Sequence, residues 1–257
     1  MRIAQMPSAA LGRSLPLAIV EPRAAASAPA TREPGAVLYF FHGRGRNHGS
    51  LLEPPATRRA LLDAPFTIVL PQGEDGWHVD SPERPADRYE TYLEEVIAWV
   101  ETHRAVRRDA AGRGLAGWSM GGYGAVRFAQ RHSGEFGFVA SVIGLLDFPR
   151  QETLPRGQNY AVPVDRFGSE PAVWRTFNPL HALGDLRGVA LALVLSETGF
   201  ERTMNERFLA AASEAGLPVR VHRLEGGHEF ALVQQAVPLV LADAAELFAR
   251  PSRESAR

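Results

Sequence analysis

The sequence contains no cysteine and no lysine, and the 28 basic residues, all arginine, nearly balance 29 acidic residues. Without cysteine the chain has no disulfides, no thiolate metal ligands and no cysteine nucleophile. A net charge of −1 gives no bulk electrostatic attraction to nucleic acid or to an anionic membrane. The composition thus excludes cysteine catalysis and thiolate metal sites, and it gives no sign of binding to nucleic acid or to a membrane. We expect the partner to be a small molecule.

Long apolar runs are also missing. No run approaches the roughly twenty apolar residues of a membrane span. Near the N-terminus, Arg13 and Pro16 interrupt the chain before an apolar run reaches the length of a signal peptide. We therefore expect a cytoplasmic protein. The hydrophobic content of 45% is that of an ordinary globular chain, and we expect residues 1–257 to form a single α/β domain.

Short apolar segments alternate with amphipathic ones. The apolar segments predict strands at Leu15–Val20, Ala36–Phe41, Phe66–Leu70, Phe136–Gly144 and Val189–Leu195. The segment Pro218–Leu224, which also contains arginines, is expected to be the last strand. The amphipathic segments predict helices at Arg88–Val106, Glu201–Gly216 and Phe230–Phe248. Strands that alternate with helices favour a mostly parallel central sheet with helices on both faces. Ligands of such sheets bind at the carboxyl ends of the strands.

Two stretches have neither pattern. Arg23–Gly35 is rich in small residues and contains proline, which predicts a loop. Asp147–Leu183 is a long irregular stretch between two core strands, and we expect residues 147–183 to form a lid or a pocket wall. Its aromatic residues would then limit the size of the substrate.

The segment AGWSMGGYGA, from Ala116 to Ala125, packs four glycines around one serine. A predicted strand precedes Ser119 and a predicted helix follows it, so Gly117 to Gly121 is a Gly-x-Ser-x-Gly element in the setting of a nucleophile elbow. The sharp turn lifts the serine hydroxyl clear of the sheet, and the helix directs its N-terminus at developing negative charge. Although the pattern also occurs by chance, this setting favours Ser119 as a nucleophile.

A serine nucleophile needs a base, and in α/β-hydrolases the order along the chain is serine, acid, histidine. Four histidines follow Ser119: His132, His181, His222 and His228. His228 lies in EGGHEF, a glycine loop directly after the last predicted strand, whereas the other three lie at a helix end, in the irregular stretch and within a strand. We predict that His228 is the base.

The oxyanion of an acyl-transfer reaction needs two fixed N–H donors. The residue after the nucleophile, Met120, should supply one. The loop His42-Gly43-Arg44 follows a buried strand and should supply the other, with the Arg44 N–H as the first candidate and that of Gly43 as the second. His42 is expected to orient this loop.

Over nearly its whole length the sequence resembles the esterase D family of α/β-hydrolases, which includes tributyrin esterases, S-formylglutathione hydrolases and feruloyl esterases. The resemblance lies in LYFFHGRGRNHGS, IVLPQGEDGWHVDSP, RYETYLEEVIAWVE, AGWSMGGYGAVRFAQRH, FNPLHAL and GGHEF. It implies an α/β-hydrolase fold with a small lid insertion, and a Ser-His-acid esterase mechanism that uses no cofactor and no metal. The single-domain bacterial carboxylesterases are the most similar branch.

The acid is where the sequence departs from the family pattern. Many relatives have an aspartate in the loop that here is SETGFE, and glycine stands at the corresponding position, Gly199. Other relatives place a glutamate early in the loop, which Glu197 matches. We expect Glu201 to begin the next helix as a first-turn acid. The prediction is therefore Glu197, with Glu201, Asp185 or no acid at all as alternatives.

The sequence thus predicts a serine carboxylesterase that hydrolyses small acyl esters through an acyl-enzyme. Trp118, Trp77 and Trp174 are expected to line the substrate pocket, although each could equally belong to the core. Two other functions stay open. One is a catalytically silent module that binds a ligand, and the other is acyl transfer to an acceptor other than water. The natural ester and the oligomeric state leave no signal in the sequence.

Overall fold

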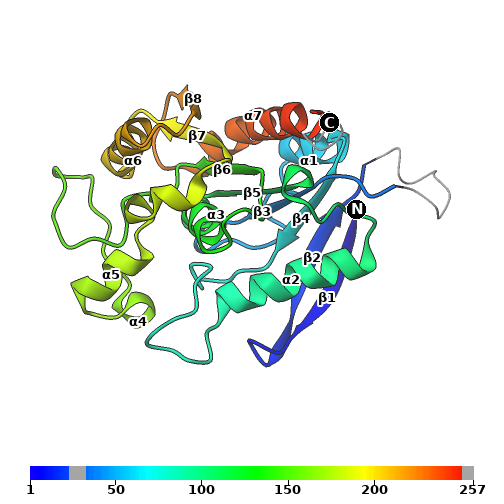
Figure 1. Cartoon of the computed structure of the whole chain (residues 1–257), viewed down its shortest axis with the longest axis horizontal. Helices are drawn as coiled ribbons and strands as arrows, with labels where there is room; N and C mark the ends of the chain where they lie inside the picture. Colours follow the sequence, from blue (N-terminus) through cyan, green and yellow to red (C-terminus); the bar gives the residue numbers. More distant parts are fainter. Residues whose placement is uncertain (23–32, 251–257) are drawn as a thin grey trace.

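The computed structural model describes residues 1–22 and 33–250 (Figure 1). These residues form an eight-stranded sheet in the order β1-β2-β4-β3-β5-β6-β7-β8. Its strands are β1 (Arg2–Ser8), β2 (Arg13–Val20), β3 (Val37–Phe41), β4 (Thr67–Pro71), β5 (Arg113–Trp118), β6 (Phe138–Val142), β7 (Ala190–Ser196) and β8 (Val219–Leu224). The strands from β3 to β8 are parallel, while β1 and β2 pair antiparallel with their neighbours. The predicted mostly parallel sheet is confirmed.

Helices cover both faces of this sheet. They are α1 (Pro55–Asp63), α2 (Tyr89–His103), α3 (Met120–Arg131), α4 (Val164–Phe167), α5 (Pro171–Phe177), α6 (Arg202–Glu214) and α7 (Phe230–Phe248). Successive side chains of a strand point to opposite faces. Tyr39 therefore joins the core that contains residues of α2, α3 and α6, and Phe40 joins the core formed with α1 and α7. Figure 1 shows α1 and α7 side by side. Burial on both faces explains why the central strands are apolar throughout.

Helix α7 is long and apolar enough to cross a membrane by length and composition alone. In the structure its residues Leu232, Val237 and Val240 are fully buried in the core with the sheet. Packing against the sheet therefore accounts for its apolar composition.

The sequence prediction missed β1 and α1. Strand β1 pairs with β2 over its whole length, from Arg2 opposite Ile19 to Ser8 opposite Arg13. It lies at the edge of the sheet and is largely exposed, so its sequence carries no apolar run. The loop predicted at Arg23–Gly35 falls mostly on residues 23–32, which lie outside the described residues.

The stretch 147–183 contains α4, α5 and a turn of 3-10 helix at Pro179–His181, and it ends where a second one, Leu183–Leu186, begins. Its Phe148 and Phe167 pack with Trp77 and Tyr123 into a buried aromatic cluster. Met120, the first residue of α3, belongs to the same cluster. The stretch thus forms a wall beside the start of α3, at the carboxyl edge of the sheet.

Candidate active site

Ser119 lies at the sharp turn between β5 and α3, with a φ of 54° and a ψ of −120°. A positive φ is strained for a residue with a side chain and occurs mainly where the surroundings enforce it. The two flanking glycines allow the close backbone packing that holds Ser119 in this conformation. A Cβ at Gly117 would lie 2.2 Å from the carbonyl oxygen of Gly121, and one at Gly121 would lie 2.3 Å from that of Phe41. Only glycine allows the elbow to close, and the predicted turn is present.

His228 lies in the loop between β8 and α7, and its Nε2 is 2.8 Å from the Oγ of Ser119. The loop contains Gly226, which has a φ of 118° that favours glycine. The side chain of His228 is largely buried. The structure therefore brings together the serine and the histidine that the sequence singled out.

The acid beside His228 is Glu201. Its Oε2 lies 2.7 Å from the Nδ1 of His228, and the residue is fully buried. Glu197 is exposed, and only its backbone is bound, with its carbonyl accepting a hydrogen bond from Arg202. The predicted placement of Glu197 against His228 is wrong.

The reason is the path of the loop between β7 and α6. The Gly199 N–H bonds to the Oγ of Ser196, so the chain turns tightly after the strand and residue 201 comes back beneath His228. A Cβ at Gly199 would lie 2.4 Å from both carboxylate oxygens of Glu201. The glycine that occupies the relatives' aspartate position thus provides the space that the glutamate carboxylate fills. Glu201 stands at the N-cap of α6, where the helix was expected to begin, but its side chain makes no capping bond and faces His228 instead.

These contacts assign the protons of the histidine ring. An ionised carboxylate only accepts hydrogen bonds, so the Nδ1 of His228 carries the proton that faces Glu201. The Nε2 is then free to accept the hydroxyl proton of Ser119. Ser196, which sequence reasoning missed, donates from its Oγ to the Oε1 of Glu201, so both carboxylate oxygens are bound. The geometry suits removal of a proton from Ser119.

His42 fixes the loop that follows β3. Its Nε2 accepts the N–H of Gly73 at 2.8 Å, so its Nδ1 is protonated and donates to the carbonyl of Gly43, also at 2.8 Å. Burial lowers the pKa of His42, which keeps the ring in this neutral form. The Gly43–Arg44 peptide is planar and trans, so the Arg44 N–H points opposite to the held carbonyl.

The loop after β3 and the start of α3 both have free donors. Among residues 33–250, the backbone N–H groups of Arg44, Gly43 and Met120 donate to no protein acceptor, so both candidates from the loop remain. Gly43 lies directly against the serine, because a Cβ there would be 3.3 Å from the Cβ of Ser119 and 2.6 Å from the Nε1 of Trp118. The arrangement can therefore bind a developing oxyanion beside Ser119.

A cleft of about 170 Å³ opens at Ser119 and His228. Its apolar walls are Trp118, Ile143, Phe230 and Val233, and Arg44, Arg46 and Glu229 contribute charge. Trp118 was predicted to line the substrate pocket, and it lines this cleft. Trp77 does not reach this cleft because it is buried in the aromatic cluster, and Trp174 lines a different cleft.

Sequence patterns gave no sign of the aromatic stack over the base. Phe200 lies with its ring centroid 4.3 Å from that of His228, and Tyr160 stacks on Phe200 at 5.3 Å. The hydroxyl of Tyr160 accepts a hydrogen bond from the guanidinium of Arg44 at 2.8 Å. This contact links the wall formed by residues 147–183 to the loop after β3, so the wall also borders the site.

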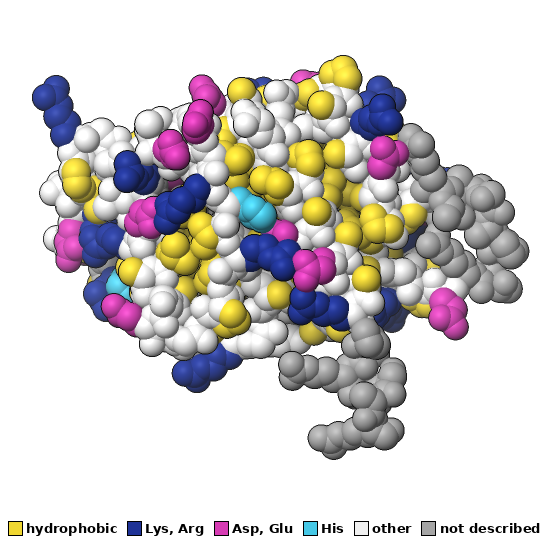
Figure 2. Space-filling view, turned by 90° about the horizontal axis from the view of Figure 1, so that it is seen from above, with side chains coloured by type: hydrophobic (Ala, Val, Ile, Leu, Met, Phe, Trp, Pro, Cys, Tyr) yellow, Lys and Arg dark blue, Asp and Glu magenta, His cyan; other side chains and the backbone are white. Residues whose placement is uncertain are grey.

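Within the described residues, no group of three or more histidine, aspartate or glutamate side chains is arranged to hold a metal ion. Figure 2 shows arginine and acidic side chains interspersed over the face seen from above, with apolar side chains between them. The charge of this face is therefore mixed rather than of one sign.

Comparison with known proteins gives one family. A family model described as "Putative esterase" matches residues 8–236. Two curated relatives from Mycobacterium tuberculosis, Esterase Rv1288 and Esterase MT1326, are 26% identical over 225 residues. The match covers 76% of this chain and 48% of each relative, so the chain spans about half the length of the curated relatives it matches.

Solved structures match over nearly the whole chain. The serine hydrolase FphF of Staphylococcus aureus has a TM-score of 0.82 at 17% identity, with 95% of this chain and 97% of that one covered. A ferulic acid esterase has a TM-score of 0.79 at 22% identity, and the match covers 96% of this chain and 97% of that one. An S-formylglutathione hydrolase of Agrobacterium tumefaciens has a TM-score of 0.78 at 18% identity, and the match covers 96% of this chain and 95% of that one. At these identities the likeness establishes the fold, which is that of the α/β-hydrolases.

Proposed function

The chain belongs to the family described as putative esterases, and from that premise we propose that it is a serine carboxylesterase acting on small acyl esters. The observation that carries the proposal is a continuous chain of contacts from Ser119 to His228 to Glu201, with 2.8 Å and 2.7 Å between the bonded atoms. A strained serine, an oriented histidine and a buried carboxylate are the parts that nucleophilic catalysis requires.

The proposed reaction has two halves. In the first, the Nε2 of His228 takes the hydroxyl proton as Ser119 attacks the ester carbonyl, and Glu201 stabilises the imidazolium. The N–H groups of Arg44 and Met120 hold the oxyanion. His228 then protonates the leaving alcohol. In the second half, water attacks the acyl-enzyme by the same route and releases the acid.

The small cleft at Ser119 supports a short acyl group as the substrate. Four apolar side chains bound it, and about 170 Å³ leaves little room for a long chain. We expect kcat/KM for p-nitrophenyl esters to be highest between acetate and butyrate and to fall by about a hundredfold at the octanoate, because the part of a chain that extends beyond the cleft gains no burial energy. Initial rates across the ester series measure this.

Val233 offers a matched variant for this experiment. It lies in the wall of the cleft and is buried, so Val233→Ala should enlarge the cleft and move the optimum toward longer chains. Equal rates across the series, unchanged by Val233→Ala, would contradict the assignment of the cleft. Absence of hydrolysis of every ester, together with no labelling by a fluorophosphonate, would contradict the esterase proposal itself.

Ser196 provides a test of the acid's surroundings. Its hydroxyl binds the carboxylate oxygen of Glu201 that His228 does not use. Ser196→Ala should lower kcat by about tenfold with little change in KM, since a hydrogen bond to a charged group is worth about 1.5–3 kcal/mol. Ser133→Ala, whose hydroxyl binds the carbonyl of Asp185 instead, is the control. Equal kcat in the two variants would remove Ser196 from the proposal.

A further inference from the structure

A second cleft, of about 370 Å³, lies between the segment after β6, α5 and α6. Three arginines line it, namely Arg150, Arg175 and Arg207, together with the acidic residues Asp147 and Glu152. None of these residues lines the cleft at Ser119. The second cleft therefore carries one more positive charge than negative charge and is a separate feature of the fold.

Asp147 holds two of these arginines next to each other. Its side chain is 3% exposed, and its Oδ2 lies 3.2 Å from the Nε of Arg150 and 3.1 Å from the Nε of Arg207. Its Oδ1 accepts a hydrogen bond from Asn178. Both guanidinium groups thus form ion pairs with the buried carboxylate through Nε, without a hydrogen bond to its Oδ2, and their terminal nitrogens are left for other partners. Two cations held this closely repel each other, and Asp147 compensates only one of their two charges.

The terminal nitrogens are only partly used. Glu152 lies 3.1 Å from the Nη2 of Arg150 and 3.8 Å from that of Arg207, but its side chain is 77% exposed. The side chain of Arg150 is only 10% exposed, and its Nη1 has no hydrogen-bond partner among the described residues. A buried guanidinium N–H without an acceptor is costly. The pair already binds one exposed carboxylate and still has donors unused.

The rest of the cleft is mixed, with the polar side chains of Gln151, Asn178 and His181 beside an apolar part. Pro149, Trp174 and Leu180 line it, and the indole N–H of Trp174 is already bonded to the carbonyl of Gly168. The tryptophan thus offers ring surface rather than a donor. A bare inorganic anion would leave this surface uncovered. The lining suits a molecule with a charged end and an apolar body.

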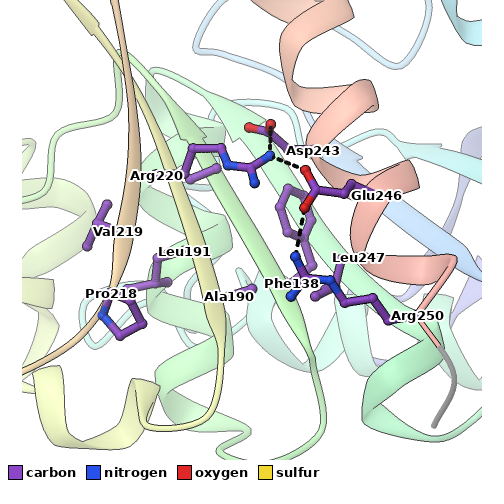
Figure 3. A pocket seen from close by; sticks show the side chains of 11 residues that line it. Phe138, Ala190, Leu191, Pro218, Val219, Arg220, Asp243, Glu246, Leu247 and Arg250 are labelled. Carbon is purple, nitrogen blue, oxygen red and sulfur yellow. Dashed lines mark hydrogen bonds and ion pairs between the residues drawn. The ribbon is translucent and has the colours of Figure 1, made fainter.

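A third cleft, between β7, β8 and α7, shows the contrast (Figure 3). Arg220 binds both Asp243 and Glu246 there, and Arg250 binds Glu246. The bonds from Arg220 and Arg250 lower the pKa of Glu246 to about 2. Two positive and two negative side chains are joined in that cleft, as Arg150 and Arg207 are joined to Asp147 and Glu152 in the second cleft. No third arginine lines it, so it presents no excess charge to a ligand.

We propose that the cleft around Arg150 and Arg207 is a binding site for a small organic oxyanion, a carboxylate or a phosphate monoester. The oxyanion binds the terminal nitrogens of Arg150 and Arg207, with Arg175 beside it, and the apolar body lies along Trp174. The site is distinct from the one at Ser119. Arg207 lies on α6 and Arg150 lies in the segment after β6, so the bound anion joins α6 to that segment.

Calorimetric titration at constant ionic strength tests the site. Benzoate, phenyl phosphate and inorganic phosphate are the probes, and the tighter of the two aromatic anions identifies the preferred oxyanion. We expect one site per chain, and inorganic phosphate should bind at least about tenfold more weakly because it covers no apolar surface. Inorganic phosphate that binds as tightly as phenyl phosphate would overturn the organic ligand class.

Arginine variants locate the binding. Arg207→Gln and Arg175→Gln should each lower the affinity for the more tightly bound aromatic anion by about tenfold, because each removes a charge-assisted hydrogen bond. Both side chains are exposed enough for the fold to persist, and thermal unfolding verifies this. Arg202→Gln, on the same helix outside the cleft, and Arg46→Gln, at the Ser119 cleft, should change affinity by less than about twofold. The proposal would be overturned if binding does not saturate or if Arg207→Gln leaves the affinity unchanged. A loss of affinity in Arg46→Gln would overturn it as well, because it would place the anion at Ser119.

Discussion

Replacing Ser119 with alanine is expected to lower kcat for p-nitrophenyl acetate by about 10⁵-fold to 10⁶-fold, the range found when a triad nucleophile is removed. The hydroxyl is the group placed 2.8 Å from the Nε2 of His228, and the elbow leaves no other nucleophile at that position. Single-turnover and steady-state rates of the purified variant give the effect. Labelling by a fluorophosphonate should disappear with the activity.

The fold should survive this change. Ser119 makes its backbone bonds to Val142 and Tyr123, and alanine keeps them. Thermal unfolding of Ser119→Ala should therefore match that of the unchanged protein. His228→Ala should lose as much activity, and the double variant should lose no more, because nucleophile and base act as one unit. Retention of more than a few per cent of the turnover by Ser119→Ala would exclude it as the nucleophile.

Replacing Glu201 with glutamine is expected to lower kcat by about 10³-fold to 10⁴-fold, as for other triad acids. An amide that donates to the Nδ1 of His228 would force the ring proton onto Nε2, and a protonated Nε2 cannot accept the proton of Ser119. The change removes one negative charge and keeps the size of the side chain. Rates with one short ester suffice to measure it.

Glu197→Gln is the matched control, because it makes the same chemical change four residues earlier in the same loop. Glu197 is exposed, and its carboxylate makes no hydrogen bond or ion pair with the described residues, so its variant should lower kcat by less than about tenfold. The reverse order of effects would assign the role to Glu197. Two nearly unchanged variants would show that Ser119 and His228 work without an acid from this loop.

The sequence alone determined the sheet, the nucleophile and the base as candidates. The apolar runs of β3, β4, β6 and β7 predicted these strands within a few residues, because strands buried on both faces need apolar residues throughout. Ser119 and His228 were found because each lies in a local pattern, glycines around a serine and a glycine loop after a strand. The required backbone geometry is built by neighbours in the chain, so the sequence records it directly.

The acid and the clefts were decided by tertiary structure. Glu197 and Glu201 are both acidic residues of one short loop, and their order along the chain does not tell which one turns inward. That depends on the bond between Gly199 and Ser196 and on the space that Gly199 leaves against the Glu201 carboxylate. Likewise, Trp77 and Trp174 carry the same side chain as Trp118, yet one is buried among aromatic rings and the other lines the second cleft. A side chain's direction and neighbours come from segments far apart in the chain, and only folding brings those segments together.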